Sequence, residues 1–231
     1  MGKTAVHRRS ANRNRRYFFW GEKMCTSHQL INLGFAEAEL PMGTHICQIY
    51  SDEKERDESL LRFLAAGLRD NERGACFSND FDVLQIENFC RHEGLNIDDI
   101  RSRQALAVSD VSSVYFKDGE FSPENMLALL EAYYDKAETD GFSAARVVGE
   151  MTREVNYIKG GKRLLEYESR VSILLREKPV TAMCQYDARE FDGATIMEVL
   201  RVHPMMVVSG AVVRNPFFVS PEEYLKRCEY V

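Results

Sequence analysis

Strand-like and helix-like hydrophobic patterns alternate along this chain from about residue 43, and this alternation constrains its fold more than any other feature. The strand-like runs are continuous apolar blocks, which is typical of strands covered on both faces. These runs lie at 45–50, 74–79, 105–110, 145–151, 180–187 and 205–213. Helical spacing of apolar residues lies between them, at about 54–70, 82–93, 123–139, 162–177 and 193–202, with a short helix after Ser220. We therefore predict an α/β fold, a doubly wound and mostly parallel sheet with helices on both faces.

The chain divides into three expected parts. Residues 1–23 are predicted as a basic, disordered tail, residues 24–42 as a helical preface, and residues 43–231 as one α/β domain. Within that domain, 111–121 is predicted as a loop or hairpin. No apolar run approaches the roughly 20 residues of a membrane-spanning helix, and no secretory signal opens the sequence. A cytoplasmic protein without membrane contact is expected.

Charge is unevenly distributed between the tail and the rest of the chain. Residues 1–23 carry seven Lys and Arg against one acid, a net +6 within a total of −6, which leaves −12 on the remainder. A body of this charge repels phosphate polymers, so nucleic-acid binding by the body is not expected. Contact of the basic tail with nucleic acid or with an acidic partner stays open.

The six cysteines form no CxxC pair, and several lie in apolar strand-like runs. Closely spaced ligand pairs are the usual signature of zinc sites. In a chain without an export signal, such cysteines are expected to be reduced and buried. We therefore predict neither a metal site nor a cofactor.

The predicted sheet also indicates where a ligand would bind. In open parallel sheets the ligand crevice lies beyond the carboxyl ends of the strands. The side chains predicted to line it, as the ligand-binding site, are Tyr50, Asn79, Asp80, Glu150, Met151, Tyr186 and Asp187. His45 and His203 fall at the starts of strands, where packing roles are expected.

The turn after the first strand does not have the composition of a phosphate-binding loop. The run YSDEKERDESLL (50–61) contains five acids, two basic residues and no glycine, whereas a GxxxxGK[ST] loop needs glycines and a lysine. Glu150 stands at a strand end, where an NTPase would hold magnesium or activate water, but no phosphate loop accompanies it. GxSxG and GxGxxG motifs are also absent. A non-catalytic protein is expected.

Six phrases carry a resemblance to a known family. They are GTHICQIYSDEKERDESLLRFLAAGL (43–68), ARVVGEMTREV (145–155), LLEYESRVSILL (164–175), AMCQYD (182–187), VLRVHP (199–204) and NPFF (215–218). In this order they resemble the MEDS domain, the methanogen/methylotroph DcmR-type sensory domain, over about residues 30–225. The resemblance implies a RecA/KaiC-like fold that has lost its phosphate loop, and a role in sensing small hydrocarbon-derivative-like molecules.

The resemblance also singles out individual positions. The matching residues are His45, Tyr50, Glu150, Met151, Glu168, Cys184, Tyr186, Asp187 and His203. For His45, Glu168, Cys184 and His203 a structural role and a ligand contact both stay open. Arg153 departs from the family pattern, which often has an aromatic residue after GEMT.

The leading hypothesis is a non-catalytic, cytoplasmic sensory domain that binds a small organic ligand at the crevice and signals to a partner regulator or kinase. One alternative is a residual KaiC-like ATPase that uses Glu150 as a base. A second is a homo-oligomeric assembly protein in which the preface helix 26–36 or the tail helix 221–228 lies on a neighbouring subunit. A third is nucleic-acid binding through residues 1–23.

Overall fold

A computed structural model describes residues 29–228 of the chain. The basic segment 1–23 and the first five residues of the expected preface lie outside the described residues. Across residues 29–228 we find no helix with the length and hydrophobicity needed to span a lipid bilayer.

The centre of the fold is a twisted sheet that contains seven strands within the described residues, in the order β5-β4-β6-β7-β3-β8-β9. Its strands are β3 (His45–Tyr50), β4 (Glu72–Phe77), β5 (Leu106–Ser109), β6 (Ala144–Met151), β7 (Val180–Asp187), β8 (Met205–Val208) and β9 (Ala211–Arg214). Neighbouring strands are parallel except for β8 and β9, which pair antiparallel. This confirms the predicted α/β, mostly parallel architecture.

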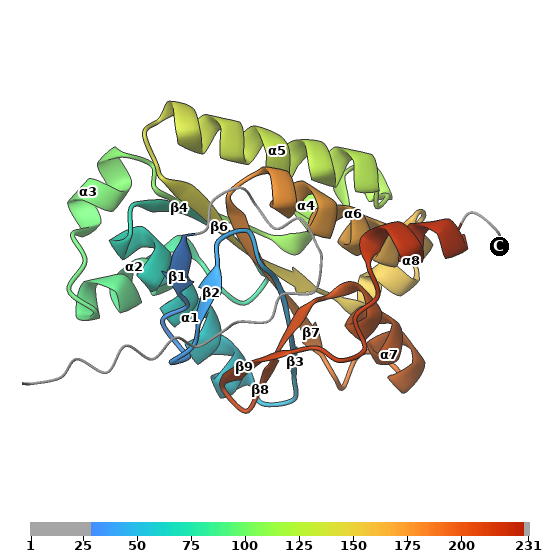
Figure 1. Ribbon diagram of the computed structural model, residues 1–231. Helices are drawn as coiled ribbons and strands as arrows, with labels where there is room; N and C mark the ends of the chain where they lie inside the picture. Colours follow the sequence, from blue (N-terminus) through green and yellow to red (C-terminus); the bar gives the residue numbers. More distant parts are fainter. Residues whose placement is uncertain (1–28, 229–231) are drawn as a thin grey trace, which may run out of the picture.

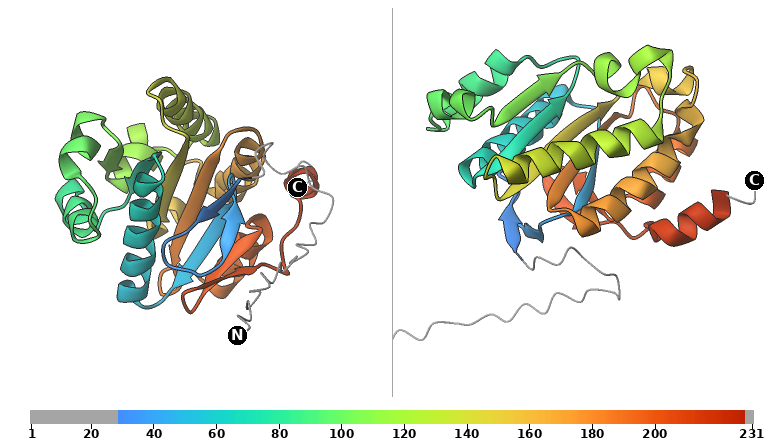
Figure 2. Two further views of the ribbon diagram at one scale, coloured as in Figure 1. Left: turned by 60° about the vertical axis from the view of Figure 1, so that its left-hand side comes forward. Right: turned by 90° about the horizontal axis from the view of Figure 1, so that it is seen from above.

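Helices cover both faces of the sheet, as Figures 1 and 2 show. One face is covered by α1 and α2, and the other by α4, α5, α6 and α7, with α8 packed on α6. The helices are α1 (Glu53–Arg69), α2 (Val83–His92), α3 (Ile97–Ser102), α4 (Val111–Tyr115), α5 (Pro123–Thr139), α6 (Leu164–Glu177), α7 (Gly193–Val202) and α8 (Pro221–Cys228), with short 3-10 turns η1 (Lys117–Gly119), η2 (Arg153–Asn156) and η3 (Gly161–Arg163).

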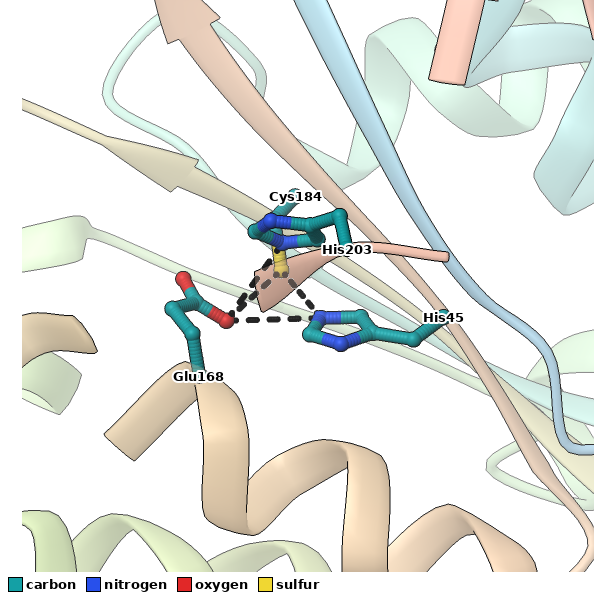
Figure 3. Close-up of side chains that lie close together, drawn as sticks. All are labelled: His45, Glu168, Cys184 and His203. Atoms are coloured by element: carbon teal, nitrogen blue, oxygen red, sulfur yellow. Dashed lines mark hydrogen bonds and ion pairs between the residues drawn. The ribbon is translucent and has the colours of Figure 1, made fainter. Parts of the chain in front are cut away.

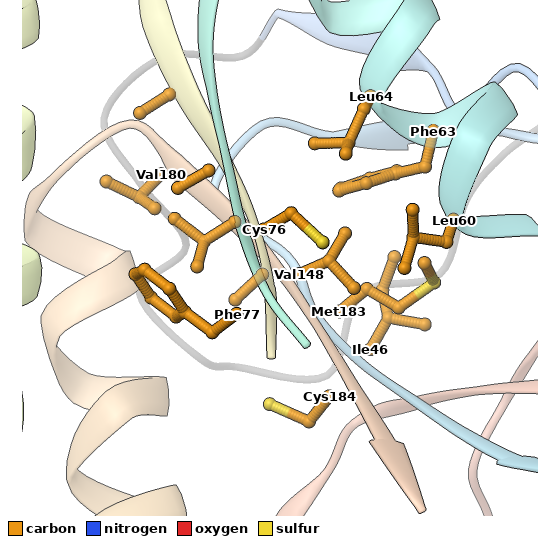
Figure 4. Close-up of a cluster of buried hydrophobic side chains, with 14 of the residues drawn as sticks. Ile46, Leu60, Phe63, Leu64, Cys76, Phe77, Val148, Val180, Met183 and Cys184 are labelled. Carbon is orange, nitrogen blue, oxygen red and sulfur yellow. The ribbon is translucent and has the colours of Figure 1, made fainter. Parts of the chain in front are cut away.

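The core between α1 and the sheet is built from the predicted apolar positions. Leu60, Phe63 and Leu64 of α1 are fully buried, and Figure 4 shows them facing the side chains of the central strands. Burying one such side chain stabilises the fold by about 1.5–3 kcal/mol. This face of α1 fixes the helix across β4 and β6 and thereby sets where its first turn lies.

The predicted helical preface is wrong where the structure describes it. Residues 30–41 form an antiparallel hairpin of β1 (Leu30–Asn32) and β2 (Glu39–Pro41). Ile31 and Leu33 are buried while the residues beside Ile31 are exposed. Buried positions two residues apart are the signature of a half-buried strand rather than of a helix.

The apolar run 205–213 is two strands rather than the single predicted strand. The chain reverses at Ser209 and Gly210, which have φ values of 47° and 72°. Two positive φ angles in a two-residue loop match the twist of a tight hairpin. The sheet therefore ends in the antiparallel β8–β9 pair, with β9 at its edge.

The segment 111–121, predicted as a loop or hairpin, contains α4 and the turn η1 instead. Val111 and Tyr115 are buried on one side of α4, so four-residue spacing was the relevant signal. Other helix boundaries follow the sequence closely. Ser122 caps α5 by accepting from the Asn125 N–H, and Pro123 occupies its first turn.

Candidate functional site

A polar crevice of about 310 Å³ lies at the carboxyl ends of the central strands. Six of the predicted ligand-site residues line it: Tyr50, Asn79, Asp80, Glu150, Met151 and Asp187. The lining also includes residues outside that predicted set: Glu53, Arg56, Thr152, Arg153, Glu154, Arg189 and Glu190. The rule that ligand crevices lie at this edge of a parallel sheet therefore located the cavity.

Glu150, at the end of β6, is the centre of the hydrogen-bond network in the crevice. Its Oε1 accepts from the Tyr50 hydroxyl at 3.2 Å and from Arg56 Nη1 at 3.2 Å. Its Oε2 accepts from the Ser78 hydroxyl at 2.7 Å and from the Asn79 N–H at 3.3 Å. Burial and then the nearby Glu150 charge raise the pKa of Tyr50, so its phenol stays protonated and donates. This carboxylate is held by four donors.

Arg56 is the one buried residue among the lining residues that the sequence reasoning missed. Only 3% of it is exposed, and its Nη2 donates to Asp80 Oδ2 at 2.7 Å. The guanidinium lies 5.3 Å from the centre of the Tyr50 ring and 5.5 Å from that of Phe81. Helical spacing could have identified Arg56 as buried, because it precedes Leu60 by one turn and lies on the same buried face of α1. Arg56 was overlooked because it lies in a strongly charged run of the sequence.

The connection between β3 and α1 contains only Ser51 and Asp52. The Asp52 carboxylate accepts from the Glu55 N–H at 3.1 Å and so caps α1. The first-turn N–H groups of a helix are where phosphates bind in nucleotide-binding loops. In this chain one of those groups is bonded to a side chain that is itself an anion.

The charge of the crevice lining is predominantly negative. Six carboxylates face three arginines: Glu53, Asp80, Glu150, Glu154, Asp187 and Glu190 against Arg56, Arg153 and Arg189. Arg189 is already paired with Asp187 and Glu53, at 2.6 and 2.9 Å. The hydrogen bond from the Arg189 side chain holds the pKa of Asp187 below its usual range.

Tyr186 does not line the crevice, contrary to the expectation. Successive side chains of a strand point to opposite faces of the sheet, and Tyr186 lies on the face covered by α6. Its hydroxyl donates to Glu168 Oε1 at 2.5 Å. Burial is the main cause of its strongly raised pKa, with the Glu168 charge second.

Four of the nine residues carried over from the family resemblance meet at a second place, the buried tetrad of His45, Glu168, Cys184 and His203. They come from β3, α6, β7 and the end of α7, and Figure 3 shows their side chains converging on one point. All four are buried, with 8% exposure for Cys184 and 2% or less for the others. The expectation of separate packing roles for His45 and His203 did not anticipate this convergence.

The atoms of the tetrad are closely spaced. His45 Nε2 lies 3.3 Å from both Cys184 Sγ and Glu168 Oε2. Glu168 Oε2 also lies 3.5 Å from Cys184 Sγ and 3.6 Å from His203 Nε2. The two imidazole rings are tilted against each other, with centres 4.2 Å apart. The four candidate ligand atoms all lie within 4.8 Å of one another.

Burial determines the electrostatics of the tetrad. It lowers the pKa of His203 to about 3, with the nearby His45 adding to the effect and Glu168 opposing it. Burial alone would raise the pKa of Glu168, but the adjacent His45 and His203 side chains and the Tyr186 hydroxyl bring it below its usual value. Burial, followed by the Glu168 charge, raises the pKa of Cys184 well above that of a free thiol.

Comparison with known proteins gives a family and a fold. A family model described as "MEDS: MEthanogen/methylotroph, DcmR Sensory domain" matches residues 44–204. No curated protein matches the sequence. A KaiC-like protein from the archaeon Pyrococcus horikoshii is similar in structure, with a TM-score of 0.55 and 13% identity over 78% of this chain and 80% of that chain.

A second similar structure is an uncharacterized Pyrococcus horikoshii protein solved with an unknown peptide. Its TM-score is 0.52, with 14% identity over 72% of this chain and 77% of that chain. At such identities the two structures establish a shared fold, which confirms the expected RecA/KaiC-like architecture. The family model spans more than half of the sequence and includes the crevice strands and the tetrad, so the chain belongs to the MEDS family of sensory domains.

Proposed function

We propose that this chain is a non-catalytic sensory domain that binds a small, uncharged or cationic organic molecule in the crevice and signals its presence to a partner regulator or kinase. Membership of a sensory-domain family supports the sensory part. The observation that carries the ligand class is the predominance of carboxylates over arginines in the lining. An anionic, polar cavity of this size favours a small ligand with hydrogen-bond donors.

The same observations argue against a nucleotide as the ligand. Asp52 caps the helix end to which phosphates would bind, and two of the three crevice arginines, Arg56 and Arg189, are already ion-paired. A triphosphate would have to displace these pairs and approach six carboxylates, at a cost in Coulomb energy. Glu150, engaged by four donors, is poorly placed to serve as a general base.

A thermal-shift titration of the full chain tests the ligand class. A ligand that binds only the native state at 100-fold its Kd stabilises it by about 2.7 kcal/mol. We expect no change in melting temperature with Mg·ATP, and a rise with one or more members of a panel of small amines and alcohols. Native mass spectrometry of the same preparation reports co-purified ligands. A saturable Mg·ATP shift would overturn the proposal.

Two variants locate the binding event. Asp80→Asn removes a crevice charge that pairs with Arg56, and it should weaken the ligand-induced shift. Asp99→Asn removes an exposed carboxylate on α3 that is not part of the crevice lining, and it should leave the shift unchanged. Equal responses of the two variants would place the ligand elsewhere.

A further inference from the structure

The buried tetrad brings lone pairs of nitrogen, oxygen and sulfur atoms together without enough N–H, O–H or S–H groups to pair them all. His203 Nδ1 lies 2.8 Å from the Val199 carbonyl oxygen, which can only accept. The proton of this ring is therefore on Nδ1, and Nε2 directs its lone pair toward Glu168. Consistent with this, His203 Nε2 is buried and has no hydrogen-bond partner among residues 29–228.

His45 follows the same logic through Ser172. The Ser172 hydroxyl lies 3.3 Å from the Val202 carbonyl oxygen and 2.8 Å from His45 Nδ1. A hydroxyl has one proton, and when it donates to the carbonyl, it accepts from Nδ1–H. His45 Nε2 then also directs a lone pair inward, toward Glu168 and Cys184.

The interior of the tetrad is thus faced by four electron-pair donors: two imidazole nitrogens, a carboxylate oxygen and a sulfur. From these contacts we propose that His45, Glu168, Cys184 and His203 form a four-coordinate binding site for a zinc-type divalent cation. This site is distinct from the crevice and does not depend on the function proposed above.

Four of the six spacings between the ligand atoms fit such an ion, and the other two, which lie within 4.8 Å, would shorten on binding. Zinc bonds of about 2.0–2.3 Å in a tetrahedron place neighbouring ligand atoms about 3.3–3.6 Å apart. The nitrogen–oxygen distances here are 3.3 and 3.6 Å, the nitrogen–sulfur distance is 3.3 Å, and the oxygen–sulfur distance is 3.5 Å. A set of nitrogen, sulfur and oxygen donors selects zinc over calcium or magnesium, which prefer oxygen ligands alone.

The charge of the tetrad and the hydrogen bonds around it also favour a bound divalent cation. A thiolate and a carboxylate together carry two negative charges, so a divalent ion makes the buried centre neutral, which removes much of the cost of burying them. Each of the two histidines has its outer nitrogen bonded, and Tyr186 holds the outer oxygen of Glu168. Hydrogen bonds of this kind orient the ligands in protein metal sites.

The site would hold together elements that are remote in the sequence. Its four ligands bring α6 against β3 and β7 and fasten the end of α7, just before β8. A site with four protein ligands and no open position is typical of structural zinc. The ion would therefore stabilise the α6 face of the domain.

Metal analysis of the untagged full chain tests this proposal directly. We expect about one zinc per chain after purification in metal-free buffer. After unfolding with a chelator and refolding with Co²⁺, we expect thiolate-to-cobalt charge-transfer absorption together with the visible bands of tetrahedral cobalt. Refolding with Zn²⁺ should raise the melting temperature above that of the chelated protein.

Variants assign the ligands. Cys184→Ala should abolish the charge-transfer absorption, whereas Cys76→Ala, at a buried strand cysteine outside the tetrad, should retain it. His203→Gln should lose the metal, and the control His92→Gln should not, although His92 Nδ1 makes the same bond to a carbonyl four residues earlier. Ser172 is not a proposed ligand but is hydrogen-bonded to the ligand His45. Ser172→Ala should therefore weaken metal affinity by about 10–100-fold.

The proposal does not depend on the folding of any variant, because the wild-type cobalt spectrum is itself decisive. Wild-type protein without bound zinc, without a thiolate–cobalt band and without a metal-dependent melting shift would overturn the proposal and leave the tetrad as a buried ion-pair cluster. A thiolate–cobalt band that persists unchanged in folded Cys184→Ala would overturn it equally.

Discussion

The Arg146 guanidinium and the Glu72 carboxylate form a bidentate ion pair that is sealed inside the protein. Arg146 Nε and Nη2 lie 2.7 and 3.0 Å from the two Glu72 oxygens, and neither residue exceeds 2% exposure. The remaining guanidinium nitrogen donates to the carbonyl oxygens of Asn32 and Phe63. One side chain thus connects strands β4 and β6, helix α1 and the N-terminal hairpin.

Removing one partner of this pair should be strongly destabilising. Glu72→Gln leaves the Arg146 charge buried without its counter-ion, and we expect a loss of about 3–5 kcal/mol in unfolding free energy. Urea denaturation measures it. Arg62→Ala is the control, since the Arg62–Glu58 pair is exposed and should contribute at most about 1 kcal/mol. A Glu72→Gln loss no larger than that of the control would contradict the prediction.

Glu150→Gln tests the crevice network. The substitution keeps the side-chain shape but removes the negative charge facing Arg56, so we expect a loss of about 1–3 kcal/mol in unfolding free energy. Glu154→Gln is the matched control on the same crevice and should change stability little.

Phosphate release from Mg·ATP should be absent in the wild type. Turnover that disappears in Glu150→Gln would instead support the residual ATPase.

The ion pairs of Glu124 on α5 with Arg163 and Arg170 should give the chain a measurable acid sensitivity. Hydrogen bonds from Arg163, followed by a backbone N–H, lower the pKa of Glu124 from 4.5 to about 2. A lowered carboxylate pKa contributes stability that is present above 4.5 and is lost as the pH falls toward 2.

Denaturation at several pH values should therefore show Glu124→Gln less stable than the wild type near neutrality, with the difference shrinking across that window. Glu138→Gln on the same helix, which forms no ion pair within the described part of the chain, is the control. A difference that stays constant down to pH 2 would show that charge is not the cause.

Gly149 is packed against the hydroxyl of Tyr115. A Cβ atom added to Gly149 would overlap the Tyr115 oxygen, whereas the next ring atom stands 3.3 Å away. Gly149→Ala should therefore cost about 1–3 kcal/mol through overpacking. Adding Tyr115→Phe should recover part of that loss, since the overlapping oxygen is gone. Gly193→Ala, with nothing within 4 Å of its Cβ, should be neutral or slightly stabilising; an equal loss there would exclude steric overlap as the explanation.

Much of the fold could be predicted from the sequence because most strands of the parallel sheet are largely apolar runs. The runs 45–50 and 180–187 match β3 and β7 residue for residue. The errors occur where a local signal is ambiguous. The preface has apolar positions that suit a helix or a strand, and the turn at Ser209 and Gly210 interrupts a run that otherwise looks uniform.

The crevice was predictable for the same reason, since strand ends of a parallel sheet share one edge. The tetrad was not, because its convergence depends on the order of the strands. Nothing in the spacing of residues 45, 168, 184 and 203 indicates that β3 lies between β7 and β8 or that α6 covers them. Tyr186 was misplaced because its neighbour Asp187 does reach the crevice, and adjacent strand residues point opposite ways.

The position of β3 between β7 and β8 also has a consequence for how the chain folds during synthesis. Both strands that border β3 are made more than a hundred residues after it. The chain can pair β4 with β5 as it emerges, but β3 stays without a neighbour until β7 has been made. Contacts so distant along the chain carry a large loop-closure entropy and slow the folding step that completes the sheet.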